Sequence, residues 1–129
     1  MTESVVLAFD FGARRTGVAI ANTLTRAARP LQTIAADTEA TRWVAIQRLV
    51  DEWRPSAFVV GVPRHPDGTA HELTARCERF ARQLEGRYGQ RVARVDERYS
   101  SAVSVRAPDV DAEAAALILQ QWLDEARDA

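Results

Sequence analysis

Two apolar runs near the start of the chain, residues 5–11 and 17–21, constrain the fold more than any other feature of the sequence. Both are rich in the β-branched and aromatic residues that favour strands, and only a short polar segment, GARRT, separates them. So short a connection predicts an antiparallel hairpin. The first run contains a carboxylate, Asp10, near its end, and a buried strand holds such a charge only at a cost.

The rest of the chain alternates between strand and helix patterns. Further strands are expected at residues 31–34, 57–62 and 91–95. Apolar residues at helical spacing predict helices over about 41–53, 70–88 and 111–126. Three strands followed by alternating helices and strands predict a mixed α/β sheet with helices on both faces.

Length and composition bound the class of protein. A chain of 129 residues has the length of one domain, so we expect residues 1–129 to form a single domain. No apolar run approaches the roughly 20 residues of a membrane span, and the N-terminus lacks the basic segment of a signal peptide. We therefore expect a cytoplasmic protein with no membrane partner. The single cysteine, Cys77, excludes an internal disulfide and is expected to pack inside a helix.

The charge balance restricts how this chain could bind nucleic acid. The net charge is -1, so any such binding must use a local basic patch. All 17 basic residues are arginines, which excludes a Walker-type phosphate lysine and Schiff-base chemistry.

Acidic residues gather where predicted strands end and where the last helix begins. Asp10 ends the first strand, the pair Asp96 and Glu97 follows the last strand, and Asp111 starts the final helix. Asp111 lies four residues before Ala115, on the helical face expected to pack against the sheet. Catalytic groups of α/β sheets gather beyond the carboxyl ends of strands, so we expect these acids to point at one region. Grouped carboxylates repel one another unless a cation binds, and Mg²⁺ and Mn²⁺ favour such oxygen ligands.

Simpler interpretations of single acids stay open. Asp10 alone could form a turn, and Asp111 alone could cap the last helix. Asp96 could replace Glu97, because adjacent strand residues face opposite ways and predicted strand ends are in error by about two residues. Only the combination of acids favours a metal site.

The motifs of the chain, taken in order, resemble those of the YqgF/RuvX family over nearly the whole sequence. They are DFGARRTGVA at 10–19, ARPL at 28–31, GVPRHPDGT at 61–69, DERYSS at 96–101 and DAEAAALIL at 111–119. The family is described as Holliday junction resolvases and as nucleases that mature the 5′ end of pre-16S ribosomal RNA. The resemblance implies an RNase H-like fold, with a five-stranded mixed sheet whose first three strands are antiparallel.

The resemblance also implies a hydrolase, a two-metal-ion endonuclease acting on structured RNA or branched DNA. Asp10, Glu97 and Asp111 match the acidic positions that would bind two Mg²⁺ or Mn²⁺ ions. Arg98 would orient Glu97 or contact phosphate. The residues implied in nucleic-acid binding are Arg14, Arg15, Arg64, Gly61, Gly68 and Ser100. The basic patch expected around them consists of Arg14, Arg15, Arg26, Arg29, Arg64 and Arg98.

Three departures from the family pattern keep other functions open. Arg14 stands where a lysine is usual, the segment before Asp111 looks short, and Asp109 replaces a frequent lysine. We therefore expect 5′-end maturation of pre-16S rRNA, with Holliday junction resolution or a catalytically weak nucleic-acid-binding module as alternatives. A nucleotide binder of the actin-like type would need a second domain. Monomer and homodimer both stay open.

Overall fold

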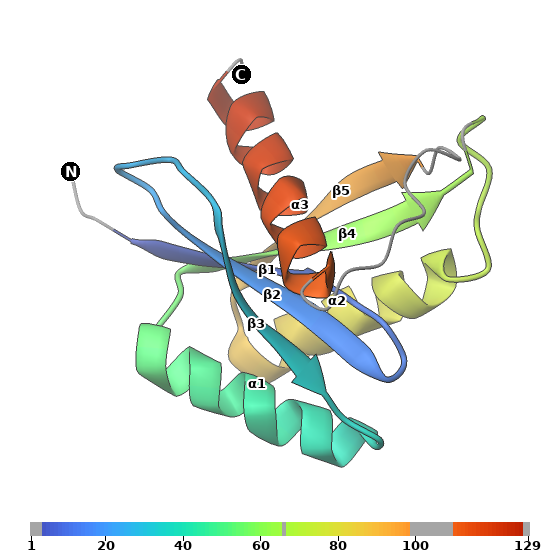
Figure 1. The fold of residues 1–129 in the computed structure, drawn as a ribbon, viewed down its shortest axis with the longest axis horizontal. Coiled ribbons are helices and arrows are strands. Elements are labelled where there is room, and N and C mark those ends of the chain that lie inside the picture. The colour runs from blue at the N-terminus through green and yellow to red at the C-terminus, as the bar shows by residue number, and fades with distance from the viewer. Residues whose placement is uncertain (1–3, 66, 99–109, 128–129) are drawn as a thin grey trace.

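The computed structural model describes residues 4–65, 67–98 and 110–127, which form a five-stranded sheet with helices on both faces (Figure 1). In chain order the elements are β1 (Val5–Asp10), β2 (Arg15–Asn22), β3 (Arg29–Ala35), α1 (Glu39–Trp53), β4 (Ala57–Arg64), α2 (Thr74–Tyr88), β5 (Arg91–Arg98) and α3 (Val110–Arg127). The strand order is β3-β2-β1-β4-β5. The first three strands are antiparallel, whereas β4 runs parallel to β1 and β5 parallel to β4. The predicted mixed sheet is therefore confirmed.

Alternation along the strands divides the interior into two hydrophobic cores. Leu7 and Phe9 of β1 face α1 and α2, whereas Val6 and Ala8 face α3. Figure 1 shows the same layers, with α3 on one side of the sheet and α1 and α2 on the other. Because side chains alternate along a strand, Asp10 belongs to the set that faces α3.

Both parallel strands continue further than their sequence predicts. β4 continues through Pro63 to Arg64, where Gly61 and Pro63 were expected to end it. Proline is tolerated here because β1 pairs with β4 only as far as Val60, so Pro63 lies beyond the part of β4 that pairs with β1. β5 likewise extends to Arg98, so Glu97 lies within the strand, opposite Pro63.

The start of α2 also differs from its prediction. The helix begins at Thr74, and the residues before it form a turn instead of helix. In this turn the Leu73 backbone N–H donates to Nδ1 of His71 at 3.1 Å, and the His71 N–H donates to the Thr74 hydroxyl at 2.8 Å. The Thr74 hydroxyl in turn donates to the carbonyl of Pro63, which ties α2 to the end of β4. None of the helices in the described ranges is long and apolar enough to cross a membrane.

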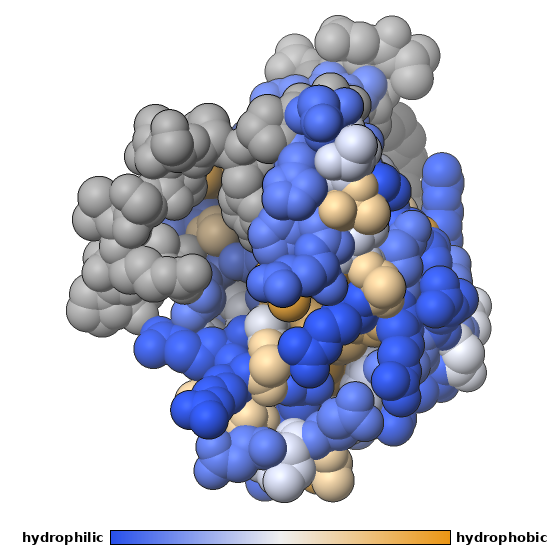
Figure 2. Space-filling model, turned by 90° about the vertical axis from the view of Figure 1, so that its right-hand side faces the viewer, coloured by the Kyte–Doolittle hydropathy of each residue, from blue (hydrophilic) through white to orange (hydrophobic). Residues whose placement is uncertain are grey.

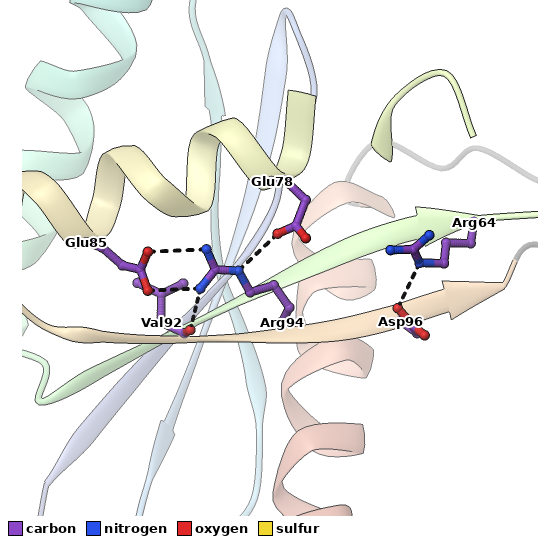
Figure 3. Close-up of polar contacts among 6 residues, drawn as sticks. All are labelled: Arg64, Glu78, Glu85, Val92, Arg94 and Asp96. Carbon is purple, nitrogen blue, oxygen red and sulfur yellow. Dashed lines mark hydrogen bonds and ion pairs between the residues drawn. The ribbon is translucent and has the colours of Figure 1, made fainter. Parts of the chain in front are cut away.

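Arg94 of β5 connects the sheet to α2 (Figure 3). Its guanidinium contacts Glu78 at 3.0 Å and Glu85 at 2.9 and 3.2 Å, and it donates to the Val92 carbonyl at 2.9 Å. These groups are partly exposed, so each pair stabilises the fold only slightly. Together they fix the position of α2 along β5.

Candidate active site

The predicted acidic residues lie at the edge of the sheet where β1, β4 and β5 end. Asp10 is the last residue of β1, and Glu97 is the last but one of β5. Both face α3, because Ala8 and Val95, two residues before them, lie in the core under that helix. Asp111 is the second residue of α3. Figure 2 views the molecule from the side on which β4 and β5 end, and this surface is covered largely by hydrophilic residues.

One carboxylate oxygen of Glu97 is buried and has no hydrogen-bond partner in the part of the chain that the structure describes. This atom, Oε1, is shielded from solvent. Burial, together with the nearby charge of Asp10, raises the pKa of Glu97 to about 8. A buried polar atom without a partner is costly, and a strongly shifted carboxyl group at the end of a strand is a candidate for function.

Gly61 of β4 makes room for Glu97. A Cβ at this position would lie 2.3 Å from Oε1 of Glu97 and 2.5 Å from Cδ1 of Ile118. Any larger residue would therefore displace the carboxylate or α3. Gly61 was expected in a loop that lets nucleic acid approach the backbone, but it is buried inside the strand, where it accommodates Glu97.

Asp111 is held in place by Arg15 and Gly17 of β2. The Arg15 Nε lies 2.8 Å from Oδ2 of Asp111, and the Asp111 side chain is only 14% exposed. A Cβ on Gly17 would lie 1.8 Å from the carbonyl oxygen of Asp111, so the start of α3 rests directly on β2. This role of Gly17 was not predicted from the sequence. Its only signal was a glycine inside a strand pattern, which often marks a close approach of another backbone.

Asp96, the alternative to Glu97, faces the other side of the sheet. It forms an ion pair with Arg64 of β4, with 3.2 Å between Nε and Oδ1 (Figure 3). Arg64 is two residues beyond Val62, which packs in the core under α1 and α2. Asp96 therefore points away from the face shared by Asp10 and Glu97.

Asp10 lies close enough to Glu97 for its charge to raise the pKa of Glu97, and the backbone of Asp111 touches Gly17, the cross-strand partner of Asp10. Burial and then the charges of Asp10 and Glu97 raise the pKa of the Cys77 thiol to about 12. Cys77 is buried in α2, as predicted, and stays protonated at neutral pH. Among the described residues, no group of three or more Asp, Glu, His or Cys side chains is arranged to hold a metal ion.

The loop between β1 and β2, which follows Asp10 directly, is held by a buried arginine of α1. Arg42 is 4% exposed, donates to the Ala13 carbonyl at 2.5 Å and lies 4.8 Å from the ring of Phe11. Gly12 allows the loop to turn tightly, because a Cβ there would lie 2.4 Å from the carbonyl oxygen of Arg15. This role of Arg42 was not predicted either, since nothing in a helix pattern tells which arginine is buried.

The remaining predicted residues are dispersed. Arg14 is exposed in the β1–β2 loop, and Gly68 adopts a φ of 89° in the loop after β4, where its N–H donates to the His65 carbonyl at 2.8 Å. The side chain of Arg98, together with Ser100 and Asp109, lies outside the described residues.

The expected basic patch is smaller than predicted. Arg26 donates to the carbonyl of Leu123, near the far end of α3, and Arg29 lies 5.9 Å from the ring of Trp53 at the end of α1. Arg29 pairs with Ile20 of β2, and Ile20 in turn pairs with Leu7 of β1. Arg29 is therefore level with Leu7, three residues before Asp10 along β1. These two arginines therefore lie away from Asp10 and do not belong to a patch around it.

Solved structures define the class of fold. Thermus thermophilus RuvC in complex with a Holliday junction substrate matches with a TM-score of 0.61 over 96% of both chains, at 14% identity. The fowlpox virus Holliday junction resolvase matches with a TM-score of 0.52 over 94% of this chain and 99% of that one, at 11% identity. The fold is therefore the RNase H-like fold of RuvC-type resolvases.

Sequence comparison then gives the family. The model of the RuvX family, described as "Holliday junction resolvase", matches residues 4–125, and the chain belongs to this family. A protein of Paraburkholderia xenovorans called "Putative pre-16S rRNA nuclease" is 48% identical over 130 residues, covering 95% of this chain and 89% of the relative. A protein of the same name from a Polaromonas species is 54% identical over 119 residues, covering 91% of this chain and 86% of the relative.

Proposed function

We propose that this chain is a metal-dependent endonuclease that hydrolyses phosphodiester bonds in nucleic acid. The observation that carries the proposal is the buried Oε1 of Glu97, which has no hydrogen-bond partner among the described residues and lies beside Asp10 at the carboxyl ends of parallel strands. Membership of the RuvX family supports the same reaction class.

The donor set fits a divalent cation of the hard type. Asp10 and Glu97 offer oxygen ligands, and a cation near them would supply the missing partner of Glu97 Oε1. We favour a site for two ions, Mg²⁺ or Mn²⁺. When bound, these ions would activate water and stabilise the departing 3′ oxygen. The cleaved strand would then carry a 5′ phosphate.

The residues of this chain have separate tasks in such a site. Glu97 has to release its proton to serve as a ligand, because its pKa is raised to about 8. Asp111 would join Asp10 and Glu97 once Arg15 withdraws from it. Arg15 is 53% exposed, so its guanidinium could then turn to a substrate phosphate. Arg98 and Ser100 keep the roles that the family resemblance implies.

The favoured substrate is structured RNA, at the 5′ end of pre-16S rRNA. Relatives that cover most of this chain at 48 and 54% identity carry the name of a pre-16S rRNA nuclease. The resolvase structures are far less similar in sequence, at 14 and 11% identity, and they support the fold alone. A cytoplasmic location follows from this substrate, and branched DNA is the alternative.

The test compares the wild type with Asp10→Asn and Asp96→Asn on a pre-16S 5′-leader RNA and on a four-way DNA junction, with Mn²⁺, Mg²⁺ or chelator. Asp96→Asn is the matched control, because Asp96 faces the other side of the sheet and pairs with Arg64. We expect metal-dependent cutting of the RNA by the wild type and by Asp96→Asn, and none by Asp10→Asn. Normal cutting by Asp10→Asn would refute the proposal. Preferential cutting of the four-way junction would make branched DNA, instead of RNA, the substrate of the proposed nuclease.

One observation favours a second candidate, a nucleic-acid-binding module with weak catalysis. Oδ2 of Asp111 forms an ion pair with Arg15, which occupies an oxygen that a metal ion would need. If this pair persists when metal and substrate are present, Oδ2 of Asp111 is withheld from the metal, and Asp10 and Glu97 have to supply most of the protein ligands. This candidate predicts RNA binding that Asp10→Asn leaves unchanged, together with no metal-dependent product.

A further inference from the structure

A pocket of about 170 Å³ lies beside the β1–β2 loop, on the side of the sheet covered by α1 and α2. Phe11 and Ala13 of the loop form one wall. Residues at the start of α1, including Arg42, form a second wall, and Arg76 and Arg79 of α2 form the third. Three arginines from two helices therefore surround one small space.

The side chains that line the pocket carry charges of both signs, with an excess of positive charge. Burial has the largest effect on Arg42 and lowers its pKa, the charge of Glu39 raises it, and the charge of Arg76 has a smaller lowering effect. Asp37 and Glu39 also line the pocket, so three guanidinium groups face two carboxylates there. Both acids are exposed, whereas Arg42 is 4% exposed and fixed by the Ala13 carbonyl and the Phe11 ring. An anion between Arg76, Arg79 and Arg42 would neutralise this excess of positive charge and could accept paired N–H donors from the guanidinium groups.

The position of the pocket relates it to the carboxylates. Its wall at Phe11 and Ala13 belongs to the loop that follows Asp10 directly. On α2, Arg76 is adjacent to Cys77, whose thiol is within the electrostatic reach of Asp10 and Glu97. A strand bound at the carboxylates could therefore pass over Arg14 of the β1–β2 loop and Arg15 of β2, both exposed, and arrive at Arg76 and Arg79.

The size of the pocket restricts its ligand. Pockets for cofactors and drug-sized ligands measure about 300 to 1,000 Å³, which is well above this volume. A whole nucleotide does not fit inside it, but a phosphate group of a chain that lies across the opening does. Arginine recognises such a group through paired N–H donors.

We propose that Arg76 and Arg79, supported by Arg42, bind a backbone phosphate of the substrate strand at a distance from the bond that is cut. This subsite deepens the proposed nuclease function and rests on it for the identity of the strand. It would set the path of the nucleic acid across the molecule and add affinity without base specificity.

The test measures binding of a labelled single-stranded RNA, and of DNA of the same sequence, by fluorescence anisotropy across a range of salt concentrations. Chelator is present throughout, so that no strand is cut. The double variant Arg76→Gln/Arg79→Gln is compared with Arg82→Gln/Arg91→Gln, which removes the same charge from two exposed positions that do not line the pocket. Circular dichroism melting checks that both variants fold.

We expect Arg76→Gln/Arg79→Gln to weaken binding about tenfold at low salt and to reduce the salt slope by about 0.7 for each phosphate that the variant no longer neutralises. The control should stay within about twofold of the wild type, and RNA and DNA should be weakened equally because they share the phosphate. An equal loss of affinity in both double variants, or no loss in either, would overturn the subsite. A loss on RNA alone would show that ribose is read, and would overturn the phosphate assignment.

The binding result and the cleavage result are independent of each other. A chain that cuts RNA with metal but binds it equally well without Arg76 and Arg79 would refute only the subsite. A chain whose binding depends on these arginines but which cuts nothing would refute only the nuclease.

Discussion

Glu97 shows how one side chain can couple stability to pH. Its pKa is about 8 in the folded protein, because it is buried and lies near the charge of Asp10. An unfolded chain restores the usual value of about 4.3. Between these values the folded state holds a proton that the unfolded state has lost, so stability falls as pH rises through this range.

Replacing Glu97 by glutamine should remove this dependence in metal-free protein. The stability that protonated Glu97 contributes to the wild type is fully present below about pH 4.3 and is lost as the pH rises through about 8. The free energy of unfolding of Glu97→Gln, taken relative to that of the wild type, should therefore be a few kcal/mol larger at pH 8 than at pH 4. Urea denaturation in chelator, at several pH values, measures the difference. Glu113→Gln, at an exposed position of α3, is the control. A pH profile that Glu97→Gln leaves unchanged would contradict the assigned pKa.

The acids could be located from sequence, but the residues that accommodate them could not. Asp10 and Asp111 were recognisable because they stand where an apolar strand ends and an apolar helix begins. Gly17 and Gly61 act through what packs against them, α3 in one case and Glu97 in the other. A sequence pattern predicts which side chains of a strand share a face, but it does not predict which atoms of other elements pack against them.

At the scale of elements, the β1–β2 loop depends on α1 for its shape. Arg42 donates to loop carbonyls and covers Phe11, and the Thr16 hydroxyl donates to the Gly12 carbonyl at 3.4 Å. The loop also sets the position of Asp10 at one end and of Arg15 at the other. A change in α1 that alters the loop should therefore also alter the position of the Asp10 carboxylate.

Arg42→Met should destabilise the protein by about 2 kcal/mol, because the Gly12 and Ala13 carbonyl groups lose their donor and the ring of Phe11 loses its cation. Urea denaturation at neutral pH gives the change, and Arg48→Met, at an exposed position of the same helix, should alter stability by less than about 0.5 kcal/mol. Equal effects of the two substitutions would mean that Arg42 does not hold the loop.

Element type and order followed from periodicity, whereas some boundaries depended on neighbours. β4 runs through Pro63 only because β1 has already ended beside it. α2 starts at Thr74 because the side chains of His71 and Thr74 satisfy the backbone of a turn before it. The extent of β4 depends on tertiary pairing that local sequence does not encode, whereas the start of α2 depends on local side-chain bonds that its apolar periodicity does not show.

At the scale of the whole molecule, the carboxylates link a cation to folding. The acids come together only in the folded chain, so a cation that binds them stabilises the folded state by about 2.7 kcal/mol at a concentration 100 times its dissociation constant. For a domain of this size we expect Mn²⁺ at pH 8 to raise the melting temperature by several degrees. Asp10→Asn should abolish the rise, and Asp96→Asn should retain it. A rise of the same size in Asp10→Asn would place the bound ion elsewhere.

The chain order of these acids has a consequence for biosynthesis. Asp10 belongs to the first strand and Asp111 to the last helix, and α3 also covers one face of the sheet. A ribosome therefore releases Asp10 early and Asp111 late, and a polypeptide interrupted before α3 lacks both an acid and the cover of one core. If the proposed function holds, hydrolytic competence would be acquired only after α3 has been translated, and products interrupted before α3 would lack it.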